Sequence, residues 1–125
     1  RVKNITVGIK SLEDGLKEFT ASIHSIAGGH RLKTKKEGTY FVDLDAMRRV
    51  LTPKRLELIH LVREKEPRSI YELSHLAGRD LKNVQTDVQL LSRIGLLSLT
   101  KTKTARETIV PRVDYDQLQL QIPVV

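Results

Sequence analysis

The chain has 125 residues, of which 39% are hydrophobic and none is cysteine. This length allows one buried core in a single compact domain, and the lack of cysteine excludes disulfides, thiolate metal sites and thiol catalysis. The 22 lysines and arginines outnumber the 15 acidic residues, and the resulting net charge of +7 favours a polyanionic partner.

Residues 1–50 are predicted to begin with a strand and a helix. The stretch VKNITVGI alternates apolar with polar or small residues, which is the period of a β-strand. A helix is expected over about residues 12–27, after a capping-box pair at Ser11 and Asp14. Its apolar residues recur at alternating steps of four and three, and they are Leu12, Leu16, Phe19, Ile23 and Ile26. This seam indicates a helix that packs either inside the chain or against a second copy.

The remainder of this N-terminal part is predicted to be a loop, a short strand and a short helix. Residues 30–38, HRLKTKKEG, carry five basic residues, counting His30, and one acid without an apolar period. We therefore expect a solvated basic loop there. TYFVDL then has the composition of a short strand, and DAMRRVL that of one or two helical turns.

Two helices are predicted next, over residues 53–66 and 70–77. Thr52 and Pro53 are typical of an N-cap and of a first helical position. The second helix begins with a capping box of Ser69 and Glu72. Helical spacing predicts that its inward-facing side chains are Ile70, Leu73 and Leu76.

A third helix is predicted over residues 81–94, with Asp80 as its N-cap and Gly95 after its end. At about 100° per residue one stripe is apolar, and the opposite stripe carries Lys82, Thr86, Gln89 and Arg93. The helix has a single acid, Asp87, on its flank, which we expect to pair with a neighbouring basic or polar group. A short turn with Gly78 joins this helix to the one before it, which matches the helix-turn-helix unit.

The C-terminal third is predicted to be three strands. LLSLTKTKTARETIVPRV reads as a hairpin whose tip spans about residues 101–106 and holds three basic residues without an acid. In DQLQLQIPVV, Leu118, Leu120 and Ile122 alternate with glutamines, which predicts a strand with one buried face. This strand is expected to pair with VKNITVGI, and with TYFVDL as a further neighbour, either within one chain or between two.

The run LTPKRLELIHLVREKEPRSIYELSHLAGRDLKNVQTDVQLLSRIGLLSL resembles the winged helix-turn-helix regulators, in the broad group of the multiple-antibiotic-resistance and arsenical-resistance repressors. More narrowly, LTPKRLEL, GRDLKNVQTDV and the IGLL exit are similar to a subfamily of predicted archaeal and bacterial transcriptional regulators. The general resemblance covers about residues 50–112, and the flanking ITVGIKSLED and LQLQIP also resemble that subfamily.

The resemblance implies an α+β fold with a winged helix-turn-helix domain over residues 51–112, a three-helix core with a β-wing. We expect residues 1–50 to form a dimerising strand-helix-strand flank and residues 113–125 to add a C-terminal strand to a small sheet with it. The implied function is a homodimeric transcriptional regulator that binds double-stranded DNA sequence-specifically. The helix of residues 81–94 would enter the major groove, and the wing tip would contact the backbone or minor groove.

Side-chain chemistry assigns the expected DNA contacts. The predicted base-reading residues are Lys82, Asn83, Gln85, Thr86 and Gln89. The predicted backbone contacts are Ser69, Tyr71, Arg79, Arg93, Lys101, Lys103 and Arg106. The predicted dimer contacts are the five apolar residues of the seam in residues 12–27.

Other functions have weaker support in the sequence. No nucleophile motif or phosphate-binding glycine loop is present, and the four histidines lack ligand spacing, so we expect no enzyme, no metal and no cofactor. No stretch approaches the roughly 20 apolar residues that cross a bilayer, and we expect a cytoplasmic protein without membrane contact. The alternatives that stay open are a DNA-binding antitoxin with a toxin as partner, and a winged-helix protein-docking module without DNA binding.

Overall fold

The structure is a computed structural model that describes residues 2–10, 38–103 and 107–124. It is an α+β fold in which four helices and five strands are described. The first elements are β1 (Asn4–Ile9), β2 (Gly38–Phe41) and α2 (Leu44–Val50). Three further helices follow as α3 (Pro53–Lys65), α4 (Ile70–Ala77) and α5 (Leu81–Arg93). The chain continues through β3 (Ser98–Lys103), β4 (Glu107–Arg112) and β5 (Gln117–Gln121). The predicted helix of residues 12–27 and most of the predicted basic loop lie outside the described residues.

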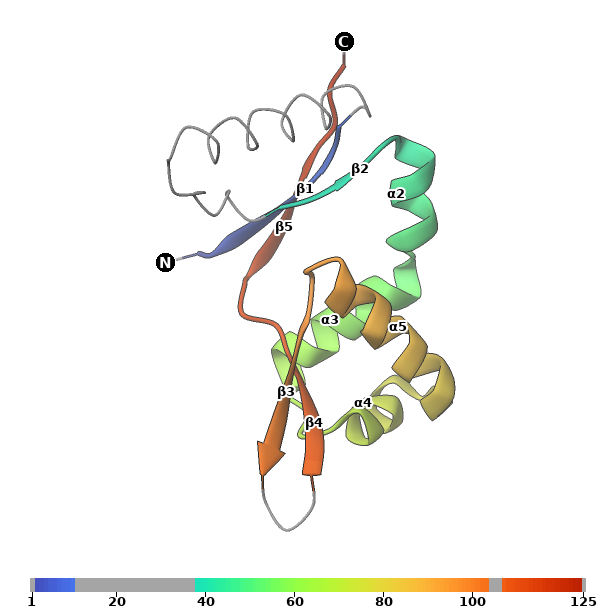
Figure 1. Ribbon diagram of the computed structural model, residues 1–125, viewed down its shortest axis with the longest axis vertical. Helices are drawn as coiled ribbons and strands as arrows, with labels where there is room; N and C mark the ends of the chain where they lie inside the picture. Colours follow the sequence, from blue (N-terminus) through green and yellow to red (C-terminus); the bar gives the residue numbers. More distant parts are fainter. Residues whose placement is uncertain (1, 11–37, 104–106, 125) are drawn as a thin grey trace, which may run out of the picture.

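The predicted flanking sheet forms within one chain. Its order is β2-β1-β5 and both pairings are parallel, with Val7 of β1 opposite Thr39 on one side and Leu120 on the other. The sheet lies at one end of the molecule, above the helices, and β1 runs between its two neighbours (Figure 1). Val7 is fully buried because it is on the central strand and faces the helical core.

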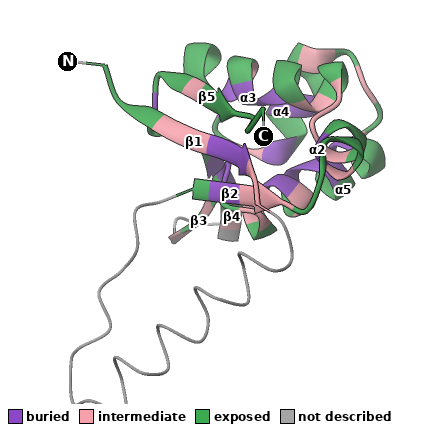
Figure 2. Ribbon diagram, turned by 90° about the horizontal axis from the view of Figure 1, so that it is seen from above, coloured by how far each residue is buried: buried purple, intermediate pink, exposed green. Residues whose placement is uncertain are grey.

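The prediction of one buried apolar face on the last strand is wrong for two of its three residues. Leu118 packs against the core, but Leu120 is 58% exposed and Ile122 is 49% exposed. The reason is that β5 lies at the edge of the sheet among the described strands, and its far end runs away from α3, α4 and α5 (Figure 1). In Figure 2 β5 is accordingly coloured mostly as exposed, whereas β1 and β2 carry buried residues.

The three predicted helices are confirmed with nearly the predicted bounds, because local signals set their ends. The Thr52 hydroxyl accepts a hydrogen bond from the Arg55 amide at 3.2 Å, and the Ser69 hydroxyl accepts one from the Glu72 amide at 2.9 Å. At the end of α5 the left-handed Gly95, with φ 86°, lets the Leu96 amide donate to the Leu91 carbonyl at 2.9 Å. The fully buried leucines and valines of these helices belong to one core, which also includes Val7, Met47 and Leu96.

One predicted core position on α4 is wrong. Leu76 is 43% exposed, while Ser74 is buried and its hydroxyl donates to the Tyr71 carbonyl at 2.6 Å. The inward stripe of α4 is centred between Ile70 and Ala77, so Leu76 lies about 110° away from it around the helix. A serine that can satisfy its hydroxyl on the helix backbone occupies the buried place instead.

The predicted hairpin is confirmed, but its strands are longer than the sequence suggested. β3 and β4 pair antiparallel from Ser98 opposite Arg112 to Lys103 opposite Glu107. Lys101 and Lys103 therefore belong to a strand and not to the tip. The alternation of threonine with lysine fits a strand as well as a turn, and strand pairing decides between them.

Polar contacts of residues 113–116 join the sheet to the helices. The Tyr115 hydroxyl donates to the Leu96 carbonyl at 2.6 Å, and burial, together with the neighbouring Asp114 charge, raises the pKa of this hydroxyl. The Asp116 carboxylate accepts from the Lys3 amide at 2.8 Å and from the Arg63 guanidinium of α3. A second link runs from the Thr39 hydroxyl of β2 to the Ile94 carbonyl after α5.

Candidate nucleic-acid interface

The outward face of α5 has the composition that the sequence predicted. Val84, Val88 and Leu91 are fully buried, and they turn the opposite side of the helix to solvent. The exposed residues are Lys82, Asn83, Gln85, Thr86, Gln89 and Arg93. The Thr86 hydroxyl donates to the Lys82 carbonyl at 3.0 Å, one turn back. All five predicted base-reading side chains therefore lie on one accessible surface.

Asp87, the single acid of α5, points inward and accepts hydrogen bonds from two arginines. It is 9% exposed, and its two carboxylate oxygens accept from Arg55 Nε at 3.0 Å and from Arg79 Nη2 at 2.7 Å. Arg55 also donates to the Arg49 and Val50 carbonyls at 3.0 and 2.9 Å, so it holds the end of α2 as well. The cluster ties α5 to α3 and to the α4–α5 turn, and it removes the negative charge from the exposed face.

This geometry corrects the expected role of Arg79. The sequence placed Arg79 among the backbone contacts, but its guanidinium binds Asp87 and its side chain is only 18% exposed. One of its nitrogens, Nη1, is buried without a hydrogen-bond partner. The Schellman-type end of α4, with the Arg79 amide on the Ser74 carbonyl at 3.0 Å, directs the side chain inward. Arg79 therefore holds Asp87 and does not extend from the surface toward a DNA backbone.

The start of α4 presents two of the predicted backbone contacts. Ser69 caps the helix with its side-chain oxygen, and the hydroxyl hydrogen stays available to an acceptor. Tyr71 is 62% exposed, and its ring meets the His75 ring edge-to-face at a centroid distance of 4.5 Å. Both residues are near the first free amides of α4, where an anion is stabilised by the helix dipole.

The hairpin presents part of the predicted basic surface. Lys101 is exposed on β3, and Lys103 ends that strand. Arg106 lies outside the described residues, as do the five predicted dimer-contact residues in the segment 12–27.

A family model with the description HVO_A0114 matches residues 50–120, which is more than half of the chain. The chain belongs to the HVO_A0114 family. No curated protein and no solved structure matches it. The part shared with the HVO_A0114 family runs from the end of α2 through α3, α4, α5 and the hairpin into β5. It therefore contains the whole Arg55–Asp87–Arg79 cluster and the exposed face of α5.

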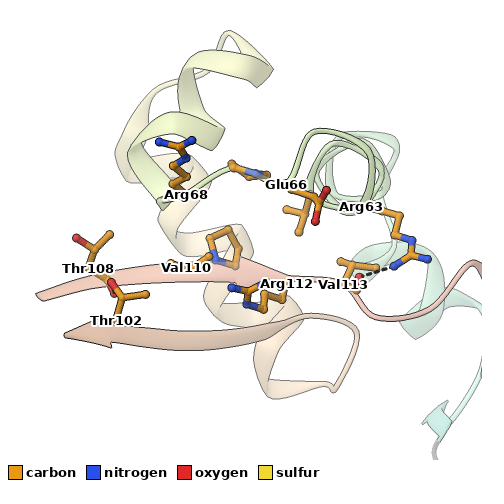
Figure 3. A pocket seen from close by; sticks show the side chains of 11 residues that line it. Arg63, Glu66, Arg68, Thr102, Thr108, Val110, Arg112 and Val113 are labelled. Carbon is orange, nitrogen blue, oxygen red and sulfur yellow. Dashed lines mark hydrogen bonds between the residues drawn. The ribbon is translucent and has the colours of Figure 1, made fainter. Parts of the chain in front are cut away.

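The HVO_A0114 region also forms a cavity that the sequence did not signal. Its volume is about 850 Å³, and it lies between the end of α3, the α3–α4 connection and β4 (Figure 3). Arg68 and Arg112 belong to its walls, while Arg63 turns toward the Val113 carbonyl, to which it donates at 3.2 Å. A single arginine before an N-cap or within a strand has no distinguishing pattern. The exposed Arg68 and Arg112 at this cavity were therefore missed.

Two negative findings apply to the described residues of this HVO_A0114 protein. Among them, no group of three or more histidines, acids or cysteines could hold a metal ion. None of the described helices combines the length and the apolar content that a bilayer crossing needs.

The buried cluster predicts a pH dependence of stability. Burial alone raises the pKa of Asp87, but the hydrogen bonds from Arg79 and Arg55 and the charges of both guanidiniums outweigh it and hold the pKa below its ordinary value. A carboxylate with a lowered folded-state pKa stabilises the fold above its unfolded-state pKa of about 3.9 and loses this effect as the pH falls through its folded-state pKa.

We therefore expect the free energy of unfolding of the unmodified protein to fall more steeply between about pH 5 and pH 2 than that of Asp87→Asn. Urea titrations across this range would measure both slopes. Asp116, whose pKa is also lowered by hydrogen bonds from the Lys3 backbone and from Arg63, is present in both proteins and cancels in the comparison. Parallel pH profiles would contradict the assignment to Asp87.

Proposed function

We propose that this chain is a winged helix-turn-helix transcriptional regulator that binds double-stranded DNA sequence-specifically as a homodimer. The observation that carries the proposal is the exposed face of α5, which holds cations, amides and a hydroxyl while its one acid is buried and neutralised by two arginines. An ordinary solvated helix face mixes acids with bases, whereas a face that enters the major groove must avoid repulsion by phosphates.

Under this proposal α4 and α5 form the helix-turn-helix unit, and α5 lies in the major groove. Lys82 would donate to guanine, and the amides of Asn83, Gln85 and Gln89 would pair with adenine. Thr86 uses its hydroxyl hydrogen on the Lys82 carbonyl, so its methyl group would meet the thymine methyl.

The proposal also includes contacts to the DNA backbone. They are Ser69, Tyr71, Arg93, Lys101, Lys103 and Arg106, of which Arg106 and the side chain of Lys103 are proposed from the sequence alone. The first amides of α4 and the exposed Arg68 beside them add to the same cationic surface.

The test separates groove reading from charge attraction. Gln85→Ala together with Gln89→Ala removes no charge, so affinity should fall by about 1–3 kcal/mol for each base pairing that is abolished on a cognate site and hardly at all on random DNA. Fluorescence anisotropy at two salt concentrations, with DNA from upstream of its own coding sequence and with a scrambled sequence, would measure this. Asn4→Ala, which removes an exposed amide on β1, is the matched control and should leave both affinities unchanged.

Substitutions in the hairpin should affect DNA affinity in a different way. Lys103→Ala with Arg106→Ala should weaken binding to cognate and scrambled DNA alike, because phosphate contacts carry no sequence information. The slope of log K against log salt should flatten by about 0.9 for each phosphate that is no longer neutralised by a side chain. A selective decrease in affinity for cognate DNA would show that the hairpin reads sequence instead.

A protein partner is the second candidate function, either a toxin bound by a DNA-binding antitoxin or the rest of an assembly. The observation in its favour is the exposure of Tyr71 and Leu76 on α4, since exposed apolar groups are typical of contact surfaces. The contrary result would be that the double glutamine variant leaves the affinity for every DNA unchanged and strongly lowers the affinity for a protein partner. In that case the α5 face is a docking surface and the DNA proposal is wrong.

A further inference from the structure

The outer edge of β5 has no strand beside it in the described part of the chain. β5 pairs with β1 from Gln117 opposite Asn4 to Gln121 opposite Gly8, and β1 is its one described neighbour. In a parallel pairing alternate residues turn their amide and carbonyl groups to the other side. No hydrogen bond from a described residue reaches these outward groups of β5.

Within the part of the chain that the structure describes, β5 also lacks the features that protect an edge strand. Residues 117–122, QLQLQI, contain no charge and no proline, and the first proline is Pro123. Natural edge strands are commonly protected by lysine, by proline, by a bulge or by a covering element. Leu120 and Ile122 are about half exposed here, so apolar side chains accompany the open backbone groups. Such a strand is a template for pairing with another extended chain.

We propose that β5 pairs antiparallel with β5 of a second copy of this chain, so that the two three-stranded sheets become one continuous sheet. Two identical edges related by a two-fold axis can only pair antiparallel, and such an interface closes on itself as a dimer. Centred on Gln119, this pairing sets Gln117 opposite Gln121 of the other copy and Leu118 opposite Leu120. Each glutamine meets a glutamine and each leucine a leucine, in the manner of stabilising cross-strand pairs.

Charge does not oppose a second copy at this edge. Each chain carries +7, so most ways of bringing two copies together meet like-charge repulsion. The nine residues from Gln117 to Val125 carry no charged side chain, so pairing along this edge sets no like-charged side chains of the two strands opposite one another. The pairing would supply the dimer in the proposed function, but it is tested without DNA, so its failure is distinct from failure of DNA binding.

The test uses the full chain and places charge at the centre of the strand. Gln119 is exposed, and in the proposed dimer it lies next to its own copy across the two-fold axis. Gln119→Lys and Gln119→Glu should each weaken dimerisation by about fivefold, because each sets two like charges opposite one another. An equimolar mixture of the two variants should recover the affinity of the unmodified protein, because opposite charges then face each other. Sedimentation velocity at tens of micromolar would measure all three.

Thr100→Lys and Thr100→Glu are the matched controls, because Thr100 is an exposed residue of the other sheet. They should leave dimerisation unchanged, alone and mixed. Recovery in the mixture shows that both Gln119 variants are folded. A monomeric unmodified protein, or a dimer insensitive to charge at position 119, would overturn the proposal, and the second result would move the interface to another surface. Weakening without recovery in the mixture would overturn the antiparallel arrangement.

Discussion

Asp87→Ala is expected to lower the free energy of unfolding by about 3 kcal/mol, because it leaves the Arg55 and Arg79 guanidiniums without their counter-charge in a largely buried place. Both arginine side chains are about four-fifths buried, and one nitrogen of Arg79 already lacks a partner. The estimate is at the lower end for a broken buried ion pair because some solvent reaches the cluster. Urea unfolding at pH 7 would measure it.

The cause of this destabilisation can be separated from a change in packing. A triple variant, Arg55→Met, Arg79→Met and Asp87→Leu, removes all three charges and keeps similar volumes, so it should recover most of the stability. If Asp87→Ala is as stable as the unmodified protein, or the triple variant is as unstable as the single one, the carboxylate does not neutralise the arginines in the way described.

Leu73→Ala should lower the free energy of unfolding by about 2–5 kcal/mol, because it removes a fully buried side chain between α4 and the rest of the core. The helix backbone limits how far its neighbours can fill the space, so a cavity should remain. Leu76→Ala is the matched control: it makes the same substitution one turn later on the same helix, at a residue that is 43% exposed.

Leu76→Ala should lower the free energy of unfolding by about 1 kcal/mol or less, since most surface substitutions have small effects. Thermal or urea unfolding of the two variants would show the difference. Equal effects would mean that Leu76 is covered in solution, which would agree with a partner on α4 and would favour the protein-docking alternative.

Much of the candidate interface could be predicted from α5 alone. The apolar stripe of Val84, Val88 and Leu91 places the polar residues outward by helical geometry, and the structure confirms that they are exposed. Arg79 could not be assigned in this way. Its direction depends on the left-handed Gly78 and on a carboxylate eight residues later, and neither effect has a periodic pattern.

The same distinction applies to the fold. The sequence determined where the helices begin and end, because Thr52, Ser69, Asp80 and Gly95 act on amides and carbonyls only a few residues away. It also determined that the terminal segments are strands, because alternation is a local property.

Only the tertiary structure decided which strands are neighbours and which side chains they cover. β1 pairs with β5 across more than a hundred residues, and Asp87 meets Arg55 across 32 residues. Many pairings are compatible with the same local pattern, and the one that forms depends on how the whole chain buries its apolar surface and satisfies its charges. This is why Leu120 and Ile122, which alternate like buried residues, lie instead on an open edge.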